Sequence, residues 1–108
     1  MSGDQLLRVL GALANAHRLR IMAALHASGR DYVSRLAREV GLSRPLLHLH
    51  LRKLEQAGLV RSRLELSKDS KALNYFEATD FAYELSPSAI AEAVRTLTIR
   101  NADPTDRE

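Results

Sequence analysis

The chain has 108 residues, 45% of them apolar and none of them cysteine, so we expect one domain with a modest core, and disulfides, thiolate metal sites and cysteine nucleophiles are excluded. The formal net charge of +3 is unevenly spread: residues 1–63 hold 11 Lys/Arg against 4 Asp/Glu, and residues 64–108 hold 5 against 9. A basic first part suggests a polyanionic partner, although arginines scattered over solvated helix faces give the same count. No apolar run approaches the roughly 20 residues that span a bilayer, so we expect a cytoplasmic protein without membrane contact.

Two amphipathic helices are predicted at the N-terminal end. In residues 4–14 the apolar side chains fall on one helical stripe, formed by Leu6, Leu10 and Leu13. Asn15 is a good N-cap for a second helix, which Gly29 ends. Its apolar residues at helical spacing are Leu19, Met22 and Leu25.

Two shorter helices follow, joined by a tight turn. The first spans about residues 33–40, and its inward side chains are Leu36, Ala37 and Val40. Gly41 supplies a turn in which a positive φ costs little, and Ser43 caps the next helix, predicted over residues 43–57. Pro45 must lie in the first turn of that helix, where its missing N–H has no partner to lose.

The stretch LLHLHLRKL, residues 46–54, is compatible with two structures. As a strand it would place His48 and His50 on one face, as a possible metal pair. As a helix it would place Leu47, Leu51 and Leu54 on a buried stripe and separate the two histidines by roughly 200°. The capped start, the strong helix formers up to Gly58 and the few β-branched residues favour the helix, which leaves no histidine chelate.

Beyond Gly58 the pattern is typical of a β-hairpin. LVRSRLELS alternates apolar and polar residues, KDSK is a polar turn, and ALNYFEATDFAYEL is rich in β-prone aromatic residues. The second arm is too long for one straight strand, and Thr79-Asp80 marks a bend. Ser86-Pro87 begins a last helix, whose apolar stripe is Ile90, Val94 and Leu97. The tail, residues 101–108, is polar and expected to be loose.

This order of elements predicts a mainly α fold with a β-hairpin wing, a winged helix-turn-helix over residues 1–100. Ala37 is small where two helices must cross closely, and Gly41 follows four residues later at the turn. The apolar residues that pack the two helices are Leu36, Val40, Leu42 and Leu47. With these residues, the sequence resembles the ArsR/SmtB family of winged-helix repressors, from LANAHRLRIMAAL (13–25) through residues 36–60 and into the wing.

The resemblance implies a homodimer on double-stranded DNA, with the helix 43–57 in the major groove. The residues implied to face bases or their edges are Arg44, Pro45, Leu46, His48 and Leu49. His50 and Arg52 are implied to approach the DNA backbone, and the wing, residues 61–78, supplies Arg61, Arg63, Lys68 and Lys71. Ser43 and Lys53 complete the DNA-binding set, although Arg52 and Lys53 also fit a merely solvated face. In the family, Arg18 is more typical of a residue that anchors the fold by hydrogen bonds.

The first and last helices are implied to join the dimer. Their candidate interface residues are Leu6, Leu10, Leu13, Ile90, Val94 and Leu97. The same side chains could instead belong wholly to the monomer core, but terminal amphipathic helices in so small a domain favour a dimer.

The chain departs from the metal-sensing members of the family. These sense metals through cysteines near the third helix, or through acidic and histidine ligands on the last helix. Residues 31–40 contain no cysteine, and the last helix has Glu92 but no histidine. We therefore expect no metal and no cofactor, and the sequence identifies no effector.

Three hypotheses follow. The leading one is a homodimeric transcriptional regulator, most simply a repressor, that binds an inverted repeat. The second is a winged-helix module that works through protein contacts, with Leu46 and Leu49 holding a partner helix. The third is a metal-sensing repressor with an unfamiliar site built from His17, His26 or tail carboxylates. An enzyme is not expected, because the sequence contains no nucleophile elbow and no Gly-rich phosphate loop.

Overall fold

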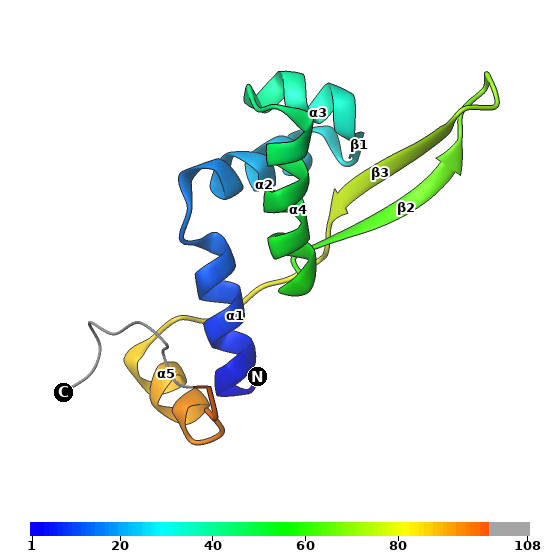
Figure 1. Ribbon diagram of the computed structural model, residues 1–108. Helices are drawn as coiled ribbons and strands as arrows, with labels where there is room; N and C mark the ends of the chain where they lie inside the picture. The colour runs from blue at the N-terminus through cyan, green and yellow to red at the C-terminus, as the bar shows by residue number, and fades with distance from the viewer. Residues whose placement is uncertain (100–108) are drawn as a thin grey trace.

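The computed structural model describes residues 1–99, and within them the five helices and the hairpin follow one another in the predicted order, with one further short strand (Figure 1). The elements are α1 (Gly3–Leu13), α2 (Ala16–Ser28), β1 (Asp31–Tyr32), α3 (Val33–Val40), α4 (Arg44–Gln56), β2 (Val60–Leu66), β3 (Ala72–Ala78) and α5 (Pro87–Val94). The winged helix-turn-helix is therefore confirmed. The tail that was expected to be loose, residues 101–108, lies outside the described residues.

The predicted helix starts and turns are confirmed by their local chemistry. Asn15, Ser43 and Ser86 each accept a hydrogen bond from the backbone amide three residues later, which is the geometry of an N-cap. Gly41 adopts the left-handed conformation, with φ of 72°, at the turn between α3 and α4. LLHLHLRKL is helical throughout, and its two histidines differ in burial: His48 is exposed and His50 is buried.

The core lies where helices α1 to α4 meet the base of the sheet. Its fully buried large side chains are Ile21, Leu25, Leu36, Leu47, Leu51, Leu54, Leu59 and Val60. Burial of each such side chain contributes about 1.5–3 kcal/mol. The predicted stripe of α4 is confirmed, since all three of its leucines belong to this set.

The inward faces of α1 and α2 differ from the prediction. In α1 the buried residues are Gly3, Leu6, Val9 and Ala12, so Leu10 points outward. In α2 the buried residues are Ile21 and Leu25, whereas Leu19 is 54% exposed. Apart from Leu6, the buried side chains of α1 are small, and Leu7 and Leu10 are left exposed. A periodic apolar pattern fits either rotation of the helix about its axis, so it could not choose between them.

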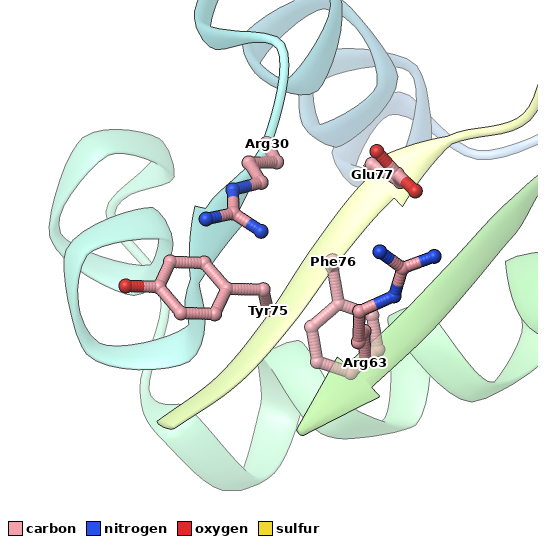
Figure 2. Close-up of a pocket in the computed structure, with 5 residues that line it drawn as sticks. All are labelled: Arg30, Arg63, Tyr75, Phe76 and Glu77. Carbon is pink, nitrogen blue, oxygen red and sulfur yellow. The ribbon is translucent and has the colours of Figure 1, made fainter. Parts of the chain in front are cut away.

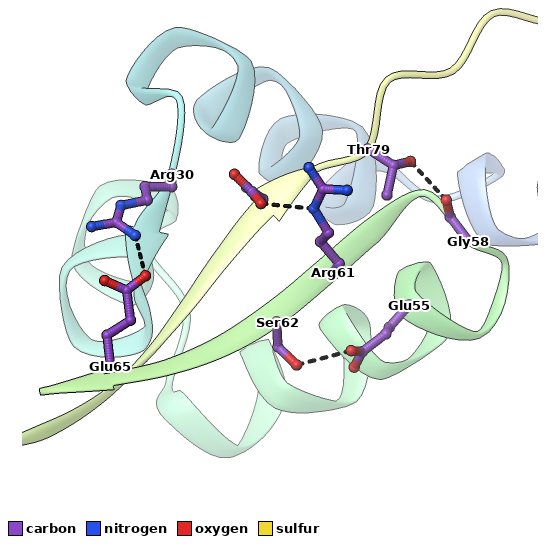
Figure 3. A network of polar contacts seen from close by, with 8 residues as sticks. Arg30, Glu55, Gly58, Arg61, Ser62, Glu65 and Thr79 are labelled. Atoms are coloured by element: carbon purple, nitrogen blue, oxygen red, sulfur yellow. Dashed lines mark hydrogen bonds and ion pairs between the residues drawn. The ribbon is translucent and has the colours of Figure 1, made fainter.

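The sheet has the strand order β1-β3-β2 and is antiparallel throughout. β2 and β3 pair from Val60 opposite Ala78 to Leu66 opposite Ala72. The two-residue β1 was not predicted, because so short a strand carries no alternation. The bend at Thr79 is confirmed: β3 ends at Ala78, and Thr79 donates hydrogen bonds from its amide to the Leu59 carbonyl at 3.0 Å and from its hydroxyl to the Gly58 carbonyl at 2.7 Å (Figure 3).

Helices α1 and α5 form an arm at the end of the molecule away from the wing tip (Figure 1). The radius of gyration is 16.3 Å, against about 13 Å for a compact domain of this length. The last helix is shorter than predicted: after Val94 the next three amides donate to carbonyls three residues earlier, in a turn, and hydrogen bonds with the start of α1 follow. The Gly3 amide donates to the Thr96 hydroxyl at 2.9 Å, and the Asp4 carboxylate accepts from the Thr98 amide at 2.7 Å. Leu97 thus lies in the turn that follows α5.

Candidate nucleic-acid interface

The side of α4 opposite the core is a continuous exposed face. The residues of the predicted DNA-binding set that lie exposed on this helix and its N-cap are Ser43, Arg44, Pro45, Leu46, His48, Leu49, Arg52 and Lys53. The face combines cations with two leucines, and Leu49 is 57% exposed. Such a mixture can contact both phosphates and the apolar edge of a base pair.

His50 lies inside, which corrects the prediction that it approaches the DNA backbone. Its side chain is only 8% exposed, and its Nδ1 accepts a hydrogen bond from Arg18 Nη1 at 3.3 Å. Because guanidinium only donates, His50 must offer a lone pair and is therefore neutral in this arrangement. Burial, together with the charges of Arg18 and His17, lowers the pKa of His50 below its ordinary value. His50 therefore attaches the inner side of α4 to Arg18 of α2.

Arg18 anchors the fold, as its family position implies. Its Nε donates to the Ala12 carbonyl at the end of α1 at 2.6 Å, while its Nη1 reaches His50 on α4. Asn15 caps the amide of Arg18 itself. One side chain thus joins α1, α2 and α4, and fixes the position of α4 relative to the N-terminal helices.

A groove of about 240 Å³ separates the N-terminal half of α4 from the wing. It is lined by Tyr32, Val33, Ser34, Arg44, His48, Ala72, Leu73 and Asn74. Arg44 and His48 therefore face the wing, whereas Leu46, Leu49 and Lys53 line a second hollow on the side of α2. The groove offers hydrogen-bond donors from α3, α4 and β3, as a passing phosphate backbone requires.

The wing presents Arg61 and Arg63 on the face of the sheet that points away from α4. Between them, Ser62 donates a hydrogen bond to Glu55 of α4 at 2.9 Å (Figure 3), and successive side chains of a strand point to opposite faces. Arg61 Nε donates to Glu77 at 2.7 Å, which lowers the pKa of the Glu77 carboxyl. Arg61 is therefore already engaged within the wing.

Arg30 joins the same outer face from the loop before β1. Its guanidinium lies 4.3 Å from the centre of the Tyr75 ring and pairs with Glu65. Figure 2 shows Arg30 and Arg63 on either side of β3, around a very small pocket that Tyr75, Phe76 and Glu77 complete. Exposed pairs of this kind contribute little to stability.

The remaining wing cations lie at its tip. Lys68 and Lys71 are exposed in the turn between β2 and β3. The Ser67 amide donates to the Lys71 carbonyl at 2.7 Å, and Ser70 adopts a positive φ of 63°. The structure therefore divides the predicted wing residues into two groups, a pair on the outer face and a pair at the tip.

The arm carries an exposed apolar surface. Its exposed apolar side chains are Leu7, Leu10, Ile90, Val94 and Leu97. Leu6 and Leu13 belong elsewhere, because Leu6 is buried within the chain and Leu13 packs against the core. Of the candidate interface residues on α1, Leu10 is therefore the one left exposed, and the dimer interface itself stays a prediction.

Sequence reasoning missed several residues that the fold brings to the site. Ser34 and Asn74 reach the groove only because β1 and α3 pack against β3, and Arg30 reaches the wing by the same packing. No local pattern marks these residues. The alternation of LVRSRLEL did allow the arginines to be assigned to one face, but it could not show which face looks toward α4.

Within residues 1–99, no three His, Asp or Glu side chains are grouped to hold a metal ion. His17 lies beside His50, with ring centres 5.4 Å apart, whereas His26 lies near Phe81 at the other end of α2. None of the helices in this described part is long and apolar enough to cross a membrane.

Comparison with known proteins agrees with this geometry. A family model described as a helix-turn-helix domain matches residues 13–63. An HTH-type transcriptional regulator of Methanocaldococcus jannaschii is 38% identical over 79 residues, which cover 73% of this chain and 81% of that protein.

Solved structures show the same fold. The homodimeric winged helix-turn-helix DNA-binding domain of a possible ArsR-family regulator from Mycobacterium bovis has a TM-score of 0.63 and 29% identity, covering 82% of this chain and 70% of that one. NolR from Sinorhizobium fredii has a TM-score of 0.60 and 26% identity, covering 85% and 79%. With its capped α4, its wing and these relatives, the chain belongs to the ArsR-type winged helix-turn-helix family of DNA-binding transcriptional regulators.

Proposed function

We propose that the protein is a homodimeric repressor that binds an inverted repeat, with α4 of each subunit in the major groove. The observation that carries the proposal is the exposed face of α4, which continues through the groove at Arg44 and His48 toward the wing. Arg44, His48 and Leu49 then meet bases, and Arg52 and Lys53 meet phosphates. Such a role needs no catalytic group and belongs in the cytoplasm, where the chromosome of a prokaryote lies.

The arm supplies the second half of the proposal. Helices α1 and α5 leave the body with Leu10, Ile90 and Val94 exposed, and a second copy related by a two-fold axis would cover these side chains. A symmetric dimer presents its two α4 helices to two half-sites, about 34 Å or one turn of DNA apart. The inverted repeat follows from that symmetry.

The test selects DNA from a random-sequence pool with the purified protein, and then compares duplexes that carry two half-sites, one half-site or a changed spacing. Fluorescence anisotropy should show tight binding to two half-sites at one spacing only, with two chains per duplex. Equal affinity for one and two half-sites would contradict the dimer, and failure to select any sequence would contradict specific DNA binding.

The protein-contact hypothesis keeps one observation in its favour, the exposure of Leu46 and Leu49 on one side of α4. The same selection experiment decides between the two, because a module built for protein contacts would show no sequence preference. Repeating the binding with a chelator, and with added zinc or nickel, tests the metal-sensing hypothesis. We expect neither addition to change the affinity.

A further inference from the structure

We propose that Leu64 and Leu66 of β2 form an apolar wedge that enters the DNA minor groove beside the major groove occupied by α4. This inference rests on the proposed DNA binding. It adds the residues by which the wing recognises DNA, and it predicts that the DNA is bent.

The two leucines lie on the face of the wing that looks toward α4. Leu64 and Leu66 share strand parity with Ser62, whose hydroxyl donates to Glu55 of α4 at 2.9 Å. Phe76, directly opposite Ser62 on β3, is buried in the core. The face that packs against the body at the base of the wing therefore continues outward as a surface that carries the two leucines.

These side chains are the most exposed large apolar residues of the described chain, at 70% for Leu64 and 76% for Leu66. Their cross-strand neighbours, Asn74 and Ala72, are polar or small and do not cover them. β2 is also an edge strand, and two adjacent exposed leucines on an edge favour aggregation unless something covers them.

The arrangement of the groove points to DNA as what covers them. Ala72 and Asn74, the partners of the leucines, line the groove together with Arg44 and His48 of α4. When α4 lies in the major groove, the sugar-phosphate strand at its border must pass through this groove. The next groove of the duplex on the wing side is the minor groove, and the wing meets it with this face.

The charges of the wing agree with that placement. Lys68 and Lys71 follow Leu66 at the tip and are exposed, so they can contact the phosphates on either side of the minor groove. The leucine face itself has no cation in β2 or β3, since Arg61 and Arg63 are on the opposite face. Contact there is therefore made by the two leucines and by uncharged side chains such as Asn74.

A second copy is a weaker candidate for covering the wedge. The exposed apolar surface of the arm lies at the opposite end of a molecule 56 Å long, so a dimer joined through α1 and α5 leaves the leucines uncovered (Figure 1). The minor groove is about 6 Å wide, which admits a leucine side chain but not the whole ribbon. Apolar side chains that enter it unstack a base step and bend the duplex, most easily at pyrimidine–purine steps.

The test uses the full chain and a duplex selected by the wild-type protein, labelled at both ends for energy transfer and carrying 2-aminopurine at the step flanking each half-site. The variant is Leu64→Thr with Leu66→Thr, which keeps good strand residues on an exposed surface. The control is Leu19→Thr, at a leucine on α2 that is 54% exposed. Affinity, bending and 2-aminopurine fluorescence are measured for all three proteins.

We expect the wild type and the control to bend the DNA and to unstack the flanking step. The double variant should lose both signals and about tenfold in affinity, a loss typical of one disrupted base-pair position. Equal bending and affinity in the double variant would overturn the wedge while leaving the proposed function intact. A change only in self-association, measured by sedimentation, would overturn it in favour of a second copy. If the wild type selects no duplex, the proposed function itself fails.

Discussion

Arg18 bonds to His50 across the junction of three helices, and this bond requires His50 to be neutral. The guanidinium Nη1 lies 3.3 Å from His50 Nδ1, and its Nε lies 2.6 Å from the Ala12 carbonyl. His17 of α2 faces the same imidazole, and Arg52 and Lys53 lie on the neighbouring part of α4. Protonation of His50 would therefore add a positive charge beside Arg18 on the inner side of α4.

Lowering the pH from about 7 to 5 should destabilise the protein, in part through His50. Because its pKa is lowered in the folded state, the unfolded chain, whose histidine titrates near 6.5, binds the proton first. The contribution of this group to the free energy of unfolding is full above about pH 6.5, and it decreases as the pH falls from there toward the folded pKa. Denaturant titration at several pH values measures it.

The variant His50→Gln keeps a carbonyl that can accept from Arg18 but does not titrate. It should flatten the pH dependence between 7 and 5, whereas His48→Gln, on the exposed side of α4, should not. Identical pH profiles for the wild type and His50→Gln would show that the buried bond does not control this dependence.

Gly3→Ala should separate α5 from α1. An added Cβ would lie 2.4 Å from the Ala93 carbonyl oxygen and 2.8 Å from Leu97 Cβ, and the first of these is backbone that cannot move aside cheaply. The free energy of unfolding should fall by roughly 1–3 kcal/mol, as for other overpacked sites. The control is Gly11→Ala in the same helix, where nothing lies within 4 Å and alanine should stabilise the helix by about 0.5–1 kcal/mol. Equal effects of the two variants on the free energy of unfolding would mean that α1 and α5 do not pack closely at Gly3 in solution.

Val94→Asp should weaken the dimer without unfolding the chain. Val94 is 54% exposed on the arm, so the monomer tolerates a carboxylate there but a covered interface does not. We expect the free energy of dimerisation to weaken by about 2 kcal/mol, which corresponds to a dissociation constant roughly 30-fold higher. Sedimentation equilibrium measures it, with Leu19→Asp, at an equally exposed leucine outside the arm, as the control. A dimer that survives Val94→Asp unchanged would place the interface elsewhere.

Features that depend on neighbouring residues in the chain could be predicted from the sequence, and features that depend on distant partners could not. The caps at Asn15 and Ser43 and the turn at Gly41 depend on chemistry within four residues, and all three are confirmed. The rotation of α1 depends on which neighbours it meets, so the choice between Val9 and Leu10 as the buried residue could not be made from periodicity alone.

The residues of the candidate site also divide into those placed by local pattern and those placed by distant partners. The exposed side of α4 follows from its own stripe of leucines, and a helix in isolation already predicts that Leu49 points outward. The burial of His50 depends on Arg18, 32 residues away along the chain, and the engagement of Arg61 depends on Glu77 across the hairpin. Long-range partners of this kind leave no mark in the spacing of the residues themselves.

DNA affinity should fall steeply with salt, because each neutralised phosphate releases counterions and adds about −0.9 to the log–log slope. Arg52→Ala and Lys71→Ala should each reduce the magnitude of the slope by about that amount per subunit. Each should also weaken binding to all DNA sequences alike. Arg61→Ala should change it less, because Glu77 already pairs with this guanidinium. Titration of anisotropy against potassium chloride measures the slope. A flat slope in the wild type would mean that the basic half does not contact DNA.

Leu49 should read a thymine. It is 57% exposed on the outer side of α4, near Leu46 and Arg52. In the major groove the one apolar feature of a base pair is the 5-methyl group of thymine, so a leucine here has a natural partner. Leu49→Ala should lower affinity for the selected duplex by roughly 1 kcal/mol and leave binding to unrelated DNA unchanged.

Replacing thymine by uracil in the selected duplex removes the same contact from the DNA side. Uracil should therefore lower the affinity of the wild type by about as much as Leu49→Ala does. It should lower the affinity of the Leu49→Ala variant little further, because two changes that delete one contact are not additive. The matched control is Gln56→Ala, an exposed polar residue on the same side of α4, for which the uracil effect should persist. Full additivity of Leu49→Ala and uracil would show that Leu49 does not touch the methyl group. In that case its exposure would favour the protein-contact hypothesis, in which Leu46 and Leu49 together hold a partner helix.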